Sequence, residues 1–145
     1  MNESEWLSCT DPERMYEFLA LAGKGSDRKM RLLRCAWLLV AISNRGETMR
    51  VMSRQAAIFR DVFGNPFRPP VFDPAWRTPT VTALAAAAYE ERELPAGTLD
   101  TQRLAVLADA LEDAGCTNER ILVHLRESSP HVRGCWVIDL LLGKE

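Results

Sequence analysis

Two cysteines and both histidines of the chain lie in its C-terminal third, at Cys116, His124, His131 and Cys135. Thiolate sulfur and imidazole nitrogen are the usual ligands of tetrahedral zinc, so this set could hold one Zn²⁺. The spacing C-x7-H-x6-H-x3-C matches no common zinc motif. Cysteine also packs well as a small core residue. The sequence therefore favours ordinary packing with no cofactor, and it leaves zinc as the alternative.

No other set of residues forms a recognisable catalytic motif. Neither histidine lies in a nucleophile motif, and no G-x-S-x-G turn occurs in the sequence. The segment Gly23–Ser26 lacks the spacing of a phosphate-binding loop. Asp139 interrupts an apolar helical pattern, and a buried acid needs a partner. We expect Asp139 to form a salt bridge or hydrogen bond to a neighbouring helix, and we predict that the protein is not an enzyme.

Basic residues gather at the expected start of a helix, at Lys24, Arg28, Lys29 and Arg31. Cations are unfavourable at the positive end of a helix dipole unless an anion lies nearby. The wider sequence is also asymmetric, with 11 Lys/Arg and 8 Asp/Glu in residues 1–70 against 7 and 12 in residues 71–145. Either the charges of the two halves complement each other or are simply solvated, or the basic residues bind an acidic or phosphate-bearing partner.

Residues 64–79, which we call the strap, contain five of the eight prolines. Proline cannot continue a helix and is disfavoured in a central strand. Aromatic residues interrupt the prolines at Phe67, Phe72 and Trp76. We predict an extended segment whose rings contact the core. Phe67 and Trp76 are candidate partner-binding residues, and the alternative is a simple crossover that covers the core.

The elements that position these residues are predicted to be helices. Apolar residues recur at helical spacing, and the segments begin at capping residues such as Thr78, Asp100 and, for the first helix, either Thr10 or Asp11. We predict a compact all-α bundle of five to seven helices in a single domain, residues 1–145, with a basic half (1–63), the strap (64–79) and an acidic half (80–145). The expected helical segments are 10–22, 26–43, 47–63, 78–93, 100–114, 117–125 and 129–143.

Two of these helices carry specific expectations. The second is apolar all round from Cys35 onward and is expected to be the central, buried helix, ending at Asn44–Gly46. The last is expected to begin at Ser129–Pro130, which would put His131 and Cys135 on the same side of one helix.

The composition favours a cytoplasmic location and disfavours membranes and nucleic acid as partners. The acidic N-terminus does not resemble a secretory signal, and the longest apolar stretch, Cys35–Ile42, is too short to span a bilayer. Four widely spaced cysteines favour reduced thiols in a cytoplasmic protein. The net charge of −2 gives no general attraction to nucleic acid or to an anionic membrane.

Several long strings in the sequence resemble a family of uncharacterised proteins from planctomycete bacteria. The matching strings are EWLxCTDP, GSDRKxRL, FGNPFRP, LADALEDAGC and HVRGCW. The resemblance covers most of the chain and implies a cytosolic bacterial protein. No activity is established for that family, so the resemblance assigns no catalytic or binding residue.

These observations together predict a non-enzymatic protein-interaction or adaptor module. Its partner is expected to be another protein, with Lys24, Arg28, Lys29, Arg31, Phe67 and Trp76 as contact residues. The alternative is a small zinc-stabilised or nucleic-acid-binding regulatory protein.

Overall fold

The computed structural model describes residues 1–43 and 48–144 and confirms an all-α fold. Within these residues there are eight α-helices, one short 3-10 helix and a two-stranded antiparallel hairpin. The elements are α1 (Glu3–Ser8), α2 (Pro12–Leu21), α3 (Asp27–Ser43), α4 (Thr48–Phe63), η1 (Pro74–Trp76), α5 (Pro79–Glu90), β1 (Arg92–Glu93), β2 (Thr98–Leu99), α6 (Thr101–Asp113), α7 (Glu119–Arg126) and α8 (Trp136–Leu142).

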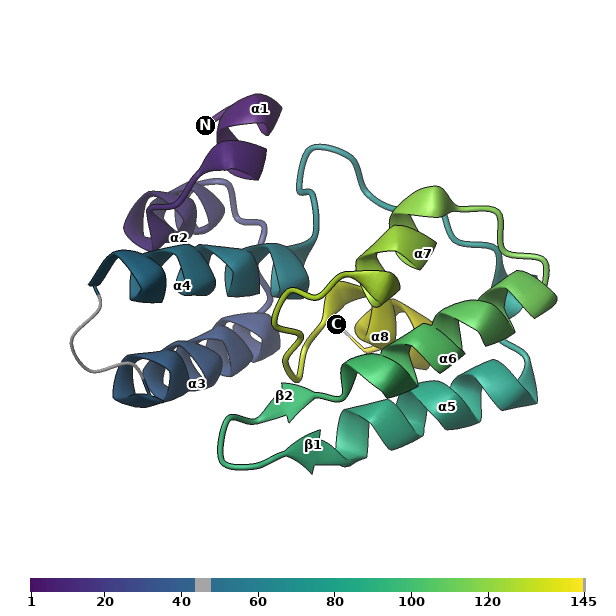
Figure 1. Cartoon of the computed structure of the whole chain (residues 1–145). Coiled ribbons are helices and arrows are strands. Elements are labelled where there is room, and N and C mark those ends of the chain that lie inside the picture. Colours follow the sequence, from purple (N-terminus) through teal and green to yellow (C-terminus); the bar gives the residue numbers. More distant parts are fainter. Residues whose placement is uncertain (44–47, 145) are drawn as a thin grey trace.

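The buried apolar side chains form two clusters that follow the order of the chain. One joins residues of α1 to α4 and includes Trp6, Phe59 and, from the C-terminal part, Val132. The other joins residues of α5 to α8 and includes Leu107 and Trp136. Figure 1 shows the same division, with α1 to α4 on one side and α5 to α8 on the other. Any group that bridges α4 to α7 or α8 therefore ties the two clusters together.

Three of the predicted helix starts coincide with capping side chains in the structure. The Asp11 carboxylate accepts hydrogen bonds from the amides of Glu13 and Arg14, and Thr78 and Asp100 cap α5 and α6 in the same way. The cap of α7 is Asn118, one residue later than the expected Thr117. Capping is a local interaction, so the sequence alone identifies it.

The expected start of the last helix was wrong. Residues from Pro130 to Cys135 form an irregular segment, and α8 begins only at Trp136. The amide of Leu99 donates to the carbonyl oxygen of His131 at 2.8 Å, which ties this segment to the hairpin. Gly134 then adopts a φ of 104°, and a Cβ there would lie 3.0 Å from Leu32 Cδ1. His131 and Cys135 are consequently not on one helix.

Helix α3 differs from its expected burial. The side chains of Cys35 and Leu38 are exposed, the latter at 62%, so the helix is not central. It packs on α4 through residues such as Leu33 and Val40. The predicted break at residues 44–46 lies outside the described residues.

Helix α1 and the hairpin β1–β2 were not predicted from the sequence. Helix α1 starts at a capping box between Asn2 and Glu5. The hairpin β1–β2 has only two residues in each strand, too few for an alternating pattern.

The strap is irregular from Gly64 to Thr78 except for η1, and its rings contact the helices as expected. Phe67 stacks on Phe18 with ring centroids 5.2 Å apart. Trp76 meets Phe72 edge-on, and both pack against the α5–α8 cluster.

Candidate metal centre

Four side chains that can bind a metal meet where α4 packs against the C-terminal half of the chain. They are Asp61 of α4, His124 of α7, His131 of the segment before α8, and Cys135 immediately before α8. Their ligand atoms all lie within 4.8 Å of one another. We call these residues the Asp–His–His–Cys cluster.

The carboxylate of Asp61 is the centre of the cluster. Its Oδ1 atom lies 2.7 Å from His131 Nδ1 and 3.1 Å from His124 Nε2. His124 Nε2 also lies 3.3 Å from Cys135 Sγ. The two imidazole rings meet edge-on, with their centroids 4.8 Å apart. These distances allow hydrogen bonds between the groups. They also mean that one possible ligand atom of each residue lies close to those of the other three.

The cluster is almost closed to solvent. The side chains of Asp61 and His131 are 2% and 0% exposed, and that of His124 is 13% exposed. Cys135 is 0% exposed. Burying an acid and two imidazoles is costly unless each polar atom has a partner.

Backbone groups contact two of the four side chains, Asp61 and His131. The amide of Val132 donates to Asp61 Oδ2 at 2.8 Å, which leaves Oδ1 directed at the other ligands. His131 Nε2 lies 3.3 Å from the carbonyl oxygen of Glu127. A histidine that binds metal through one nitrogen commonly donates the other N–H to such a carbonyl.

Protonation of the cluster reflects its burial and its internal contacts. Burial raises the pKa of Asp61, but the contacts with His124 and His131 outweigh it and hold this pKa below its usual range. Burial lowers the pKa of His131, but the contacts with Asp61 and Glu127 together outweigh it, and the net shift is upward. Burial raises the pKa of Cys135 well above its usual value, against the opposing effect of the first amides of α8. Without a cation the Cys135 thiol therefore stays protonated.

Cys116 does not belong to this cluster, which corrects the predicted ligand set. Its side chain is buried among the apolar residues of α5 to α8, and burial raises the pKa of its thiol. The other three predicted residues do come together, and Asp61 takes the fourth position. Asp61 was not predicted from the sequence, although an acid between Phe59 and Val62, on a strongly apolar helix end, was an available signal.

The predicted partner-binding cations have different environments. The Arg28 guanidinium forms a bidentate ion pair with Asp139, at 2.7 and 3.0 Å, and also donates to the hydroxyl of Tyr89 at 2.9 Å. This confirms the expectation that Asp139 pairs with a neighbouring helix. Lys24 and Lys29 donate to carbonyl oxygens of Pro66 and Val62.

Other predicted contact residues are also distributed over the fold. Arg31 is exposed on α3. Phe67 and Trp76 are each partly buried against neighbouring rings. A role in partner binding stays a prediction for the whole set.

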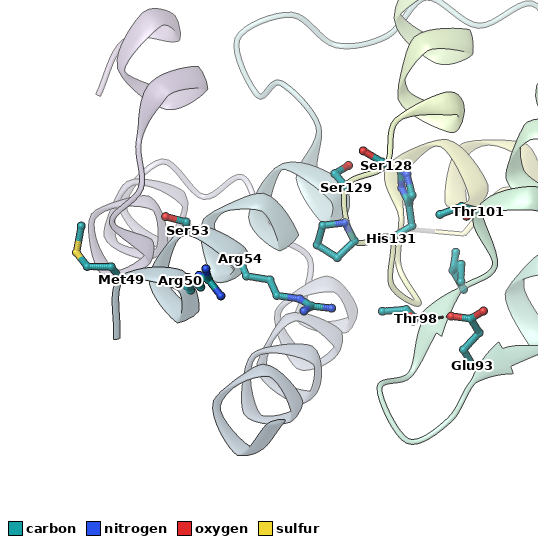
Figure 2. Close-up of a pocket in the computed structure, with 12 residues that line it drawn as sticks. Met49, Arg50, Ser53, Arg54, Glu93, Thr98, Thr101, Ser128, Ser129 and His131 are labelled. Atoms are coloured by element: carbon teal, nitrogen blue, oxygen red, sulfur yellow. Dashed lines mark hydrogen bonds between the residues drawn. The ribbon is translucent and has the colours of Figure 1, made fainter. Parts of the chain in front are cut away.

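A cavity of about 660 Å³ borders the cluster on its hairpin side. Figure 2 shows its lining side chains, with Arg50 and Arg54 from α4 on one side, Ser128 and Ser129 on another, and Thr98 opposite. His131 also lines this cavity, but none of its side chain is exposed. The cavity therefore gives solvent no path to the imidazole.

Comparisons with protein-family models, curated proteins and solved structures gave no match. The resemblance to planctomycete proteins accordingly stays a prediction. In the part of the chain that the structure describes, no helix has the length and apolar character needed to cross a membrane. The kind of site is therefore inferred from its residue types and geometry alone: it is a buried cluster that could hold a metal ion.

Proposed function

We propose that the protein is a non-catalytic helical binding module stabilised by one zinc ion. The ligands are Asp61 Oδ1, His124 Nε2, His131 Nδ1 and Cys135 Sγ. The observation that carries this proposal is the meeting of these four ligand atoms within 4.8 Å in a buried position.

The donor set supports zinc over other divalent cations. Calcium and magnesium prefer sites built from oxygen atoms, whereas zinc accepts thiolate, imidazole and carboxylate together in a tetrahedron. Zinc–ligand bonds of about 2.0–2.3 Å imply neighbouring ligand atoms roughly 3.3–3.7 Å apart. The separations between His124 Nε2 and its neighbours, 3.1 and 3.3 Å, are near these values, and the 2.7 Å contact of His131 with Asp61 must widen.

A complete set of protein ligands supports a structural role. Catalytic zinc sites keep one position open for water or substrate, and four protein ligands leave none. Asp61 comes from the α1–α4 side, and the three other ligands come from the C-terminal half. A bound zinc ion would therefore fasten the two core clusters together.

A role in binding other proteins is supported by apolar side chains that the fold leaves uncovered. Leu38 on α3 is 62% exposed and Leu94 in the hairpin is 80% exposed. Isolated exposed leucines are common, so this observation supports the interaction role less directly than the cluster supports zinc. We propose a cytoplasmic location, which suits a thiolate ligand because thiols stay reduced there.

Metal analysis of untagged protein tests the zinc site. We expect about one zinc ion per chain, and a cobalt-substituted sample should show a thiolate-to-cobalt charge-transfer band. Cys135→Ser should lose both the zinc and the band. Cys116→Ser is the matched control, because it removes another buried thiol outside the cluster.

The two variants also separate the two ligand sets. Loss of zinc in Cys116→Ser with retention in Cys135→Ser would favour the set predicted from sequence. Substoichiometric zinc in the unaltered protein, with no cobalt band, would overturn the metal site and leave a buried hydrogen-bond network.

A further inference from the structure

A second cavity, of about 330 Å³, lies where the start of α3, the end of α4, the strap, α7 and α8 meet. Its most prominent feature is its charge. Four of its lining residues are cations, namely Lys24, Lys29, Arg120 and Lys144. They come from both halves of the sequence, so only the fold brings them together.

Contacts with neutral groups position the three lysines. Lys24 Nζ donates to the carbonyl oxygen of Pro66 at 2.7 Å, and Lys29 Nζ donates to that of Val62 at 3.0 Å. Lys144 Nζ lies 5.0 Å from the ring centroid of Tyr89. Each ammonium group has three donors, so these contacts leave donors for another ligand.

Acidic side chains do not neutralise the four cations. Among the described residues, no carboxylate forms a salt bridge with any of them. The acid that lines the cavity is Asp139, and Arg28 already occupies both of its carboxylate oxygens. The cavity therefore carries an excess of positive charge.

We infer that this cavity binds a small organic phosphate. Several cations around one hollow favour a dianionic phosphoryl group over a single carboxylate, because each oxygen can accept a charge-assisted hydrogen bond. The walls formed by Phe63, Pro70 and Trp136 provide apolar surface for the organic part. The volume lies at the lower end of the roughly 300–1,000 Å³ typical of ligand pockets, which suits a small molecule.

Isothermal titration with phenyl phosphate tests the inference, in a phosphate-free buffer of low ionic strength. We expect saturable binding of phenyl phosphate and weaker binding of benzoate, which carries a similar ring and a single charge. The double variant Arg120→Gln/Lys144→Gln should weaken phenyl phosphate binding by at least about tenfold. Within residues 1–43 and 48–144, neither side chain donates a hydrogen bond, so we expect the variant to keep its stability.

Arg31→Gln is the matched control, because Arg31 is an exposed cation on α3 that does not line the cavity. It should bind phenyl phosphate like the unaltered protein. No saturation, equal affinity for benzoate, or unchanged affinity in the double variant would each overturn the inference. Zinc content is measured on the same samples and should stay constant, so a failure here is distinct from a failure of the metal site.

Discussion

Replacing Arg28 by methionine should destabilise the protein strongly, since Arg28 is the counterion of a buried acid. The Asp139 side chain is 2% exposed and that of Arg28 is 27% exposed. The carboxylate receives two charge-assisted hydrogen bonds from the guanidinium, at 2.7 and 3.0 Å. Arg28→Met removes both of them and leaves the carboxylate, which is 2% exposed, without its hydrogen-bonded counterion.

The magnitude follows from the burial of the two partners. Removing one member of a buried ion pair costs about 3–5 kcal/mol. Water can enter from the partly exposed Arg28 side, so we expect the lower end, about 3 kcal/mol. For a chain of this size that corresponds to a decrease of roughly 6–12 °C in Tm. Urea denaturation gives the free energy of unfolding directly, and calorimetry gives the Tm.

Two further variants make the interpretation specific. Arg31→Met removes an exposed cation from the same helix and should change stability by less than about 0.5 kcal/mol. Adding Asp139→Asn to Arg28→Met removes the uncompensated charge and should recover part of the loss. A loss below about 1 kcal/mol in Arg28→Met, or no recovery in the double variant, would refute the reasoning. Any loss of partner binding by an Arg28 variant must therefore be compared with its stability.

Two other predictions concern the cluster and the segment that carries it. In metal-free protein, the raised pKa of His131 contributes stability at low pH that is lost as pH rises through that pKa, and the lowered pKa of Asp61 contributes stability that is lost as pH falls through it. In urea titrations, metal-free protein should thus be most stable at mildly acidic pH. Zinc affinity should instead increase with pH, because the ligands must lose protons. The same pH dependence for stability and for zinc affinity would contradict this prediction. Gly134→Ala should cost about 1–3 kcal/mol and lower zinc affinity, because φ is 104° and the new Cβ would lie 3.0 Å from Leu32 Cδ1. Gly115→Ala, with a φ of 88° and open space around the Cβ, is the control and should cost less while zinc affinity stays constant; equal effects on both properties would contradict the steric argument.

The sequence predicts those parts of the fold that depend on neighbouring residues. A capping side chain and the first amides of its helix lie within three residues of each other, so Asp11, Thr78 and Asp100 identify their helices directly. The same reasoning fails at Ser129–Pro130, where a good helix start is followed by no helix. There the pairing of His131 with Leu99 and the turn at Gly134 outweigh local propensity.

Burial was harder to predict than helicity. An apolar pattern shows that a face can be buried, but neighbouring elements determine whether it is. Leu38 lies in the stretch of its helix that is apolar all round, and Met49 lies on the apolar side of the next helix, yet they are 62% and 77% exposed. By contrast, the cost of burying an acid predicted a partner for Asp139, although the partner's identity, Arg28, required the structure.

The composition of the Asp–His–His–Cys cluster explains why no spacing motif in the sequence indicates it. Spacing motifs describe metal sites formed by one loop or one hairpin, in which only a few residues separate successive ligands in the sequence. Here Asp61 reaches the cluster only because α4 packs against the segment around Val132, whose amide also orients the carboxylate. The absence of a known ligand spacing therefore argues only against a zinc motif formed by one short segment. It gives no information about ligands that core packing brings together from distant parts of the chain. Cys116 was chosen for its position in the sequence near His124, and the fold instead supplies an acid from the other half of the chain.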